Sequence, residues 1–304
     1  MTNENKEEKE TRKAILKKVQ KKIREIKNYT PKVGILGDSG VGKSSLCNAL
    51  FGKDVAEISD VEACTREPKE ILIGNQNEGG IILIDVPGVG ENEDRHDEYI
   101  KLYKSLLPTF DLVIWAIKSD TRNHKSAIEA YKEVLKPHLD KCPVVFAITQ
   151  SDKIEPCSKC VYPNKKYGIE AFELGEKQKE NLKGKIIDIS NAFGVLPKNI
   201  IPVAIHSDDE SKKYSYNLIE LMNEVVEVLP NEKKLSLVRE AEAENISEEA
   251  SEKAEKGVWE SIKETAGEAW DYIKDDVIDE AIDVIKEAGK TLLKCAFKWF
   301  KKLP

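Results

Sequence analysis

One eight-residue segment constrains this chain more than any other. Residues 37–44 read GDSGVGKS, which matches the pattern G-x-x-x-x-G-K-[ST]. The segment follows the apolar run 33–36 and precedes a helical pattern that begins near Lys43. Glycines let backbone N–H groups turn toward an anionic phosphate, and the start of a helix adds partial positive charge. The sequence therefore predicts a phosphate-binding loop (P-loop) between a strand and a helix.

The side chains of this loop have separate expected roles. We expect the Lys43 ammonium to reach the β- and γ-phosphates of a nucleotide, and the Ser44 hydroxyl to bind Mg²⁺. The Ser45 hydroxyl is expected at the α-phosphate. The other expected nucleotide contacts in the loop are Asp38, Ser39, Gly40, Val41 and Gly42. A glycine turn without a ligand is the alternative.

A second motif, Asp85-Val86-Pro87-Gly88, follows the apolar run 81–84. A carboxylate at the C-terminal end of a neighbouring strand can hold Mg²⁺ through a water molecule. We therefore expect Asp85 to bind the metal indirectly, and the Gly88 N–H to contact a γ-phosphate. An ordinary turn at the end of a strand is the alternative.

A third motif, Thr149-Gln150-Ser151-Asp152, closes the predicted strand 143–149. Ligands of open α/β sheets bind at the carboxyl ends of strands, so Thr149, Gln150 and Asp152 are expected beside the P-loop. A carboxylate can accept hydrogen bonds from guanine N1–H and from the exocyclic amine. Adenine presents an acceptor at N1, which would leave the carboxylate unpaired. We therefore expect Asp152 to select guanine nucleotides. ATP is the alternative nucleotide, and an aspartate without a ligand in an ordinary loop is the alternative role for Asp152.

Short apolar runs alternate with helical patterns between residues 32 and 229. The expected strands are 32–37, 69–73, 81–85, 111–117, 143–149 and 200–205, and the expected helices are 43–51, 97–107, 122–137, 175–193 and 214–228. Strands that alternate with helices predict a mostly parallel sheet covered on both faces, a doubly wound α/β fold of six strands.

Helical patterns without strands flank this region. Apolar residues recur every three or four positions in 1–29 and again in 258–302. An unbroken helix over 258–302 would be about 65 Å long, with Gly267 and Gly289 as expected breaks. We expect an N-terminal helix at 1–31, an α/β domain at 32–229 and a C-terminal helical region at 230–304, the flanking helices forming one module.

Composition narrows the protein class. The 304 residues are 40% hydrophobic, enough for a core, and the net charge of −7 argues against broad nucleic-acid binding. No run approaches the ~18 apolar residues of a membrane span, and residues 1–6 lack a secretory apolar segment. The six cysteines show no disulfide spacing, so a cytoplasmic location is expected.

The three motifs together resemble those of the TRAFAC-class GTPases, the Era- and septin-like relatives of Ras, and in particular the bacterial 50S-ribosome-binding and HSR1-related type. GDSGVGKS, DVPG and TQSD are similar to the G1, G3 and G4 motifs of that class, over about residues 32–229. The flanking helices are similar in arrangement to those of immunity-related and dynamin-like GTPases. The resemblance implies a G domain that hydrolyses GTP to GDP and phosphate with Mg²⁺ as cofactor.

Two further segments take their roles from this resemblance. Residues 60–67 resemble the first switch region, which implies that Thr65 closes on Mg²⁺ and acts, with Lys43, in catalysis. Residues 201–205 fall at the position of the G5 loop, which implies guanine contacts from Ala204 and Ile205.

The sequence departs from the family pattern at several positions. Gln150 replaces a lysine that packs over the base, which implies weaker nucleotide affinity. Val89 stands where Ras-like enzymes place a water-orienting glutamine, which implies slow intrinsic hydrolysis unless a partner or a second copy supplies the group. Gly40 replaces the asparagine associated with potassium activation. Arg66 is expected in a surface ion pair, with an arginine finger acting in a second copy as the alternative.

Weaker patterns leave alternatives open. The basic, aromatic segment 290–302 fits either a peripheral contact with an anionic membrane or packing against helix 13–27 or a second copy. Cys157 and Cys160 form a CxxC pair without an evident second pair of zinc ligands, so ordinary thiols are expected, with a zinc site or a redox pair as the alternatives. His96 is expected to be a solvated residue of the second switch, with a catalytic base as the alternative.

The predicted function is a nucleotide-dependent switch. GTP hydrolysis would release switch regions around 54–67 and 86–98 and move the flanking helices, with membrane or partner engagement and self-assembly as outputs. The alternative is a slowly hydrolysing, nucleotide-regulated binding module such as a ribosome-assembly factor.

Overall fold

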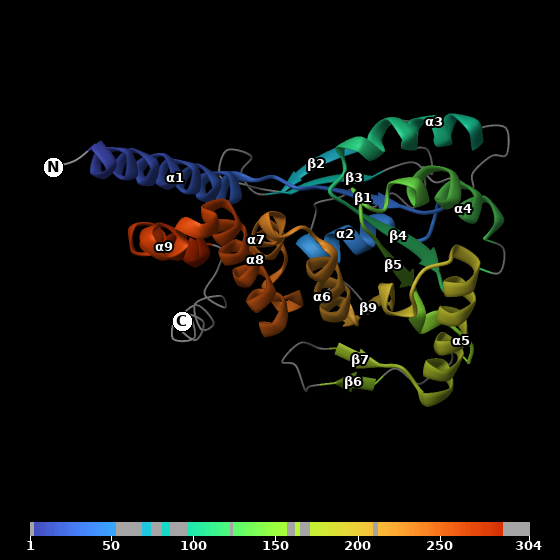
Figure 1. Cartoon of the computed structure of the whole chain (residues 1–304). Coiled ribbons are helices and arrows are strands. Elements are labelled where there is room, and N and C mark those ends of the chain that lie inside the picture. Colours follow the sequence, from blue (N-terminus) through green and yellow to red (C-terminus); the bar gives the residue numbers. More distant parts are fainter. Residues whose placement is uncertain are drawn as a thin grey trace.

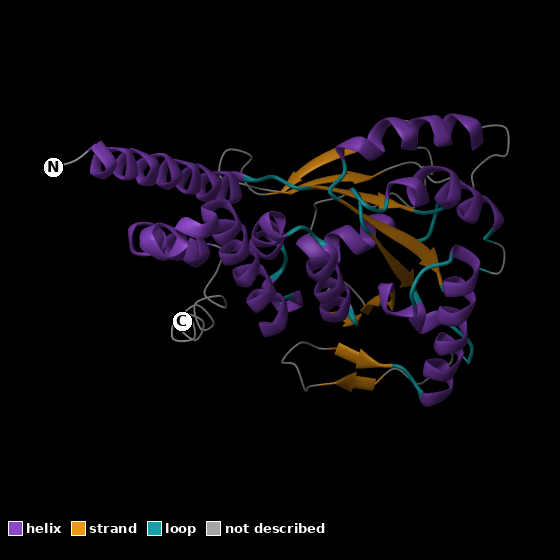
Figure 2. Ribbon diagram, viewed as in Figure 1, coloured by secondary structure: helices purple, strands orange, loops and turns teal. Residues whose placement is uncertain are grey.

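The structure is a computed structural model. It describes residues 3–52, 69–73, 81–85, 96–121, 124–156, 162–164, 171–208 and 212–287. Figures 1 and 2 show a twisted sheet with helices on both sides and a second group of helices beside it. In Figure 1, α1 (Asn3–Asn28) lies along α9 (Trp270–Glu287), so opposite ends of the described chain meet in this second group.

Six strands form the central sheet in the order β2-β3-β1-β4-β5-β8. They are β1 (Lys32–Leu36), β2 (Lys69–Ile73), β3 (Ile81–Asp85), β4 (Leu112–Lys118), β5 (Val144–Thr149) and β8 (Ile200–Pro202). Every neighbouring pair is parallel except β2 and β3. The predicted six-stranded, doubly wound α/β fold is confirmed, and the C-terminal ends of β1, β3, β4 and β5 share one edge.

Side chains alternate across the sheet and build an apolar cluster on each face. Val33 and Ile35 face one cluster, whereas Leu36 and Trp115 face the other. The first cluster includes α2 (Lys43–Phe51) and α6 (Leu218–Val228); the second includes α3 (His96–Leu106), α4 (Lys125–Ala130) and α5 (Glu176–Phe193). Because the central strands are buried on both faces, they read as continuous apolar runs.

The prediction of one strand over 200–205 is wrong. Pro202 ends β8, since proline has no N–H to continue a ladder. After Val203, β9 (Ala204–Asp208) leaves the sheet and pairs antiparallel with β10 (Lys212–Tyr216). The helix predicted over 214–228 therefore begins only at Leu218.

Two other segments differ from the sequence expectation. The predicted helix 122–137 is α4 followed by a π turn (Tyr131–Leu135) and a 3-10 turn (Lys136–His138). A hairpin of β6 (Tyr162–Asn164) and β7 (Ala171–Glu173) follows β5 and was not predicted.

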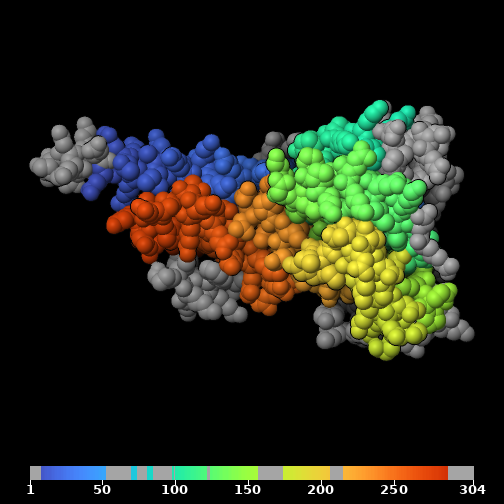
Figure 3. All heavy atoms as spheres, turned by 45° about the vertical axis from the view of Figure 1, so that its right-hand side comes forward, coloured from blue at the N-terminus to red at the C-terminus, as the bar shows by residue number. Residues whose placement is uncertain are grey.

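Four helices pack together beside the sheet: α1, α7 (Asn231–Glu240), α8 (Glu248–Ala266) and α9. The predicted apolar stripe of α1 is buried, with Val19, Ile23 and Ile26 at most 1% exposed. In Figure 3 the blue α1 lies directly on the orange and red C-terminal helices. We call this group the helical module.

The long C-terminal helix is interrupted where a glycine was expected to break it. Gly267 has φ +56°, a left-handed conformation that favours glycine, and it separates α8 from α9. Gly289 and the basic segment 290–302 lie outside the described residues. Of the helices that the structure describes, none is sufficiently long and apolar to cross a membrane.

A buried polar cluster joins the helical module to the sheet. Asp111, which precedes β4, accepts hydrogen bonds from the Tyr29 hydroxyl (2.9 Å), the Lys233 ammonium (2.5 Å) and the Lys32 N–H (2.8 Å). These donors come from the end of α1, from α7 and from β1. The division at residues 31 and 229 remains a proposal, and this cluster lies at both proposed boundaries.

One carboxyl group inside the module is not matched by a partner. Glu255 of α8 is fully buried, and neither of its side-chain oxygens has a hydrogen-bond partner in the described part of the chain. Burial raises the pKa of Glu255 to about 7, and nearby Trp259 offsets this only in part. Burying a charged carboxylate is costly, so Glu255 keeps its proton until the pH approaches 7, whereas a glutamate ordinarily ionises near 4.5.

Candidate functional site: a phosphate loop beside a base-recognition loop

The P-loop links β1 to α2, as predicted. Gly37, Gly40 and Gly42 have φ angles of +142°, +70° and +88°, which side-chain-bearing residues rarely adopt. A Cβ atom added at Gly37 would lie 2.3 Å from the backbone oxygen of Ala116 in β4. The first glycine of the motif is therefore required both by its dihedral angle and by the close approach of the neighbouring strand.

Lys43 lies over this loop. Its ammonium donates hydrogen bonds to the backbone oxygens of Gly37 and Asp38, each at 3.1 Å. Ser44 and Ser45 follow in the first turn of α2 and are partly exposed. The geometry brings a cation, two hydroxyl groups and a helix N-terminus together at the end of β1, which suits an anionic ligand.

Asp38, one of the expected nucleotide contacts, has a partly buried side chain. Its Oδ1 atom is buried and has no hydrogen-bond partner among the described residues. Burial raises the pKa of the Asp38 carboxyl, while the charge of Lys43 lowers it. The sequence names Asp38 as a nucleotide contact, but the motif does not show that this oxygen is buried without a partner.

The third motif contacts the P-loop directly, as its position after β5 predicts. The Thr149 hydroxyl donates to the Val41 carbonyl at 2.6 Å and to the Ile117 carbonyl at 3.3 Å. The Gln150 amide nitrogen donates to the Gly40 carbonyl at 3.3 Å. Two successive side chains of this motif therefore hold the backbone of the phosphate loop.

Gln150, which replaces the lysine of the family pattern, is itself held by a cation. Its Oε1 accepts a hydrogen bond from Lys153 at 2.8 Å, and its backbone adopts φ +53°. Ser119, at the end of β4, donates its hydroxyl to the Gln150 carbonyl at 2.7 Å. Sequence reasoning missed Ser119 and Lys153 because neither belongs to a motif.

Asp152 lies in a short 3-10 turn, Ser151–Lys153, directly after β5. The Ser151 N–H donates to the Val203 carbonyl at 3.1 Å, and the Val203 N–H donates to the Ile148 carbonyl at 2.7 Å. These bonds bring the G4-like turn next to Ala204, which is fully buried, and to Ile205, which is partly buried. The residues expected to contact guanine thus come from the turn after β5 and from the start of β9, which the bonds of Val203 bring together.

The metal-binding expectation is described only in part. Asp85 ends β3, and its Cα is the register partner of Ile35 in β1, two residues before the P-loop. Thr65, Gly88, Val89, Arg66, Cys157 and Cys160 lie outside the described residues, as does most of both predicted switch regions; His96 is the first residue of α3.

The donor set fits Mg²⁺. Ser44, a residue with a hydroxyl group, lies in the first turn of α2, and Asp85, a carboxylate-bearing residue type, ends the strand beside β1. Mg²⁺ prefers oxygen ligands and takes few of them from the protein when phosphates and water supply the rest. Among the described residues, no group of three or more His, Cys, Asp or Glu side chains could hold a metal without such help.

Comparison with known proteins places the site in context. Residues 32–150 match the sequence model of the family described as "50S ribosome-binding GTPase". The chain is 40% identical to YkfA of Escherichia coli (strain K12) over 181 residues, which are 59% of this chain and 58% of that protein. It is 33% identical to GTPase Era of Aquifex aeolicus over 134 residues, 43% of this chain and 44% of that protein.

The shared part is not the whole of either protein. The chain spans less than two thirds of the length of these relatives. A solved structure of Era in complex with MgGDPNP and a 16S ribosomal RNA segment aligns with 68% of this chain and 67% of its own, at 22% identity and a TM-score of 0.40.

Proposed function

We propose that the chain binds GTP and hydrolyses it to GDP and phosphate, because residues 32–150 match the 50S ribosome-binding GTPase family of the TRAFAC class of P-loop GTPases. The observation that carries the proposal is the set of hydrogen bonds between the P-loop and the segment that follows β5. Thr149 and Gln150 hold the P-loop at Val41 and Gly40, so phosphate and base would be bound by one connected frame. The match of residues 32–150 to the family confirms the resemblance expected from the sequence.

Asp152 is the proposed guanine-recognition residue. Its side chain is partly exposed, and no described residue donates a hydrogen bond to its carboxylate. Two acceptor oxygens match the two adjacent donors of guanine, whereas adenine presents an acceptor at N1 and would leave the carboxylate unpaired. GTP and GDP, rather than adenine nucleotides, are therefore the proposed ligands.

Mg²⁺ would be held by Ser44, by Thr65 and, through water, by Asp85. When bound, the ion would neutralise charge on the β- and γ-phosphates. Lys43 would contribute positive charge at the same oxygens, and the P-loop N–H groups would donate hydrogen bonds to them. Since Val89 cannot orient a water molecule, we propose slow intrinsic turnover and completion of the site by a partner or by a second copy.

The helical module would receive the conformational signal through α2. The α2 backbone begins in the P-loop and ends at Phe51, where the Glu242 N–H donates to the Leu50 carbonyl at 2.9 Å. The Asn245 amide, 1% exposed, donates to the Ala49 carbonyl at 2.7 Å. Both donors lie between α7 and α8, so one short helix is bonded to the nucleotide loop at one end and to the module at the other.

The output of this switch stays a proposal. We propose a cytoplasmic protein whose helical module engages a partner, a second copy or a membrane surface, the last through segment 290–302. The replacement of the switch glutamine by Val89 favours a second candidate, a slowly hydrolysing binding module. The description of the matched family as ribosome-binding supports the same candidate.

A nucleotide assay tests the proposal. Phosphate release would be measured with Mg²⁺ and either GTP or ATP, for the natural chain and for Lys43→Ala. We expect GTP to be preferred, and Lys43→Ala to lose binding or turnover. Equal use of GTP and ATP would contradict the role of Asp152. Turnover that rises with protein concentration would support completion of the site by a second copy, whereas measurable binding with negligible turnover would favour the binding module.

A further inference from the structure

Gln178 is a buried side chain outside every motif that contacts the proposed base-recognition turn. It lies in the first turn of α5, 26 residues after Asp152, and is 1% exposed. Its amide nitrogen donates to the carbonyl oxygens of Asp152 (3.0 Å) and Ile154 (3.2 Å). Its Oε1 accepts the N–H of Gly175, the residue before the helix, at 3.1 Å.

These three bonds use the amide fully. Both N–H donors of the amide are engaged, and its oxygen is engaged as well. An apolar replacement would leave two buried or partly buried carbonyl groups without this donor, which is unfavourable. The bond to Gly175 alone would stabilise the start of α5, but the two donated bonds reach a different segment of the chain.

The hydrogen bonds of Gln178 are the second set that holds the backbone at Asp152. On the N-terminal side, the Ser151 N–H is bonded to Val203 and the Ser151 hydroxyl donates to the Ile148 carbonyl at 2.8 Å. On the C-terminal side, the Asp152 carbonyl is bonded to Gln178. The backbone is therefore held on both sides of the Asp152 Cα, and only the two side-chain torsions of Asp152 remain to place its carboxylate.

We propose that Gln178 is a positioning residue for guanine selectivity, holding the backbone of Asp152 so that its carboxylate faces both guanine donors together. This inference rests on the proposed function. A bidentate contact depends on orientation more than a single contact does, because both acceptor oxygens must lie in the plane of the base. Loss of Gln178 would therefore reduce the contribution of the guanine amine.

The test compares GDP with IDP, which lacks the exocyclic amine. Calorimetric titration with Mg²⁺ would give the ratio of the IDP to the GDP dissociation constant for the natural chain and for Gln178→Met, which keeps the length of the side chain. We expect the natural chain to prefer GDP by about tenfold or more, and Gln178→Met to lose most of that preference. In Gln178→Glu, a protonated acid can restore one of the two donated bonds, so its ratio should be intermediate.

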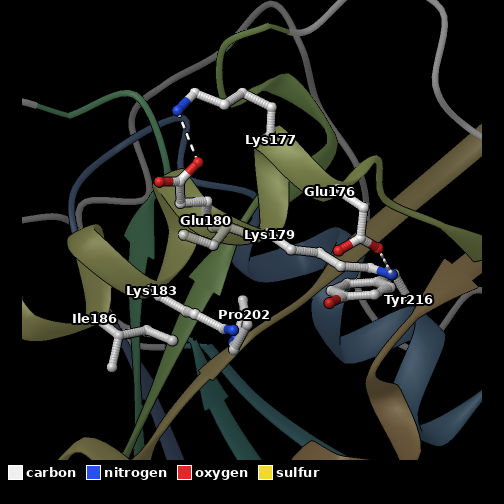
Figure 4. Close-up of a pocket in the computed structure, with 9 residues that line it drawn as sticks. Glu176, Lys177, Lys179, Glu180, Lys183, Ile186, Pro202 and Tyr216 are labelled. Atoms are coloured by element: carbon white, nitrogen blue, oxygen red, sulfur yellow. Dashed lines mark hydrogen bonds and ion pairs between the residues drawn. The ribbon is translucent and has the colours of Figure 1, made fainter.

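Lys177→Gln is the matched control. Lys177 directly precedes Gln178 in α5, and Figure 4 shows its ammonium paired with Glu180, at 2.7 Å. Both side chains are more than 60% exposed, so this variant should keep the natural GDP preference. Thermal unfolding of each variant would show that the compared proteins are folded, and Gln178→Glu carries the comparison if Gln178→Met does not fold.

The outcomes separate a positioning role from a structural one. If Gln178 only caps α5, the affinities for GDP and IDP fall by the same factor and the ratio stays at the natural value, which overturns the inference. A natural chain without preference for GDP over IDP overturns it as well. If the natural chain binds ADP as tightly as GDP, the proposed function itself fails, and that result is distinct from either of the others.

Discussion

Replacement of Glu255 by glutamine should remove a pH-dependent loss of stability from the helical module. In the folded chain, burial raises the pKa of Glu255 to about 7, with Trp259 offsetting part of the rise, whereas an unfolded glutamate ionises near 4.5. Between these values the unfolded chain gives up the proton while the folded chain retains it. The contribution of this carboxyl to stability is therefore fully present below pH 4.5 and is lost as the pH rises through 7.

The size of the effect follows from the same two values. The difference between 4.5 and about 7 corresponds, at about 1.4 kcal/mol per pH unit, to about 3 kcal/mol. Glutamine has nearly the shape of a protonated glutamate and does not titrate. Glu255→Gln should therefore match the natural chain near pH 4.5 and exceed its free energy of unfolding by up to about 3 kcal/mol at pH 8.

Urea denaturation followed by circular dichroism at several pH values would measure this difference. Glu264→Gln is the control, because it makes the same chemical change at a side chain that is exposed on the same helix. A Glu255→Gln advantage that is the same at pH 5 and pH 8, or no advantage at pH 8, would refute the reasoning.

Two other substitutions test the frame around the P-loop. Gly37→Ala should abolish nucleotide binding measured by calorimetry, because its Cβ would lie 2.3 Å from the Ala116 backbone oxygen. Gly184→Ala in α5 is the control: its Cβ meets no atom within 4 Å, so this variant should bind the nucleotide normally. Asn245→Ala should lower the free energy of unfolding by about 1–3 kcal/mol in denaturant titrations, since it leaves the Ala49 carbonyl without its donor. If Asn245→Ala is as stable as the natural chain, the hydrogen bond from Asn245 to the Ala49 carbonyl does not contribute to the free energy of unfolding.

Much of the fold followed from local patterns. Runs such as 33–36 and 144–148 are buried on both faces, and their continuous apolar character identified them as strands. The helix of residues 43–51 and the stripe on α1 were recovered for similar reasons. The error at 200–205 arose because a β-branched run gives no indication of which strand it will pair with, and Val203 separates two different partners.

The site divides in the same way. Glycines, Lys43 and the aspartates belong to motifs whose chemistry is encoded within a few residues, so their positions could be predicted. Gln178 carries no such signal, because its partners Asp152 and Ile154 lie on another segment and meet it only through the fold. The unpaired oxygen of Asp38 and the contact of Gln150 with Lys153 likewise required three-dimensional information.

The bonds at the C-terminal end of α2 have a thermodynamic consequence. A ligand that binds the helices more tightly in one arrangement of α2 must alter nucleotide affinity by the same factor that the nucleotide alters its own. The nine residues of α2 are about 14 Å long. Nucleotide binding and the binding of a ligand to the helical module are therefore separated by little more than the width of a helix. A molecule that docks on α7 or α8 could therefore set the rate of nucleotide exchange without contacting the P-loop.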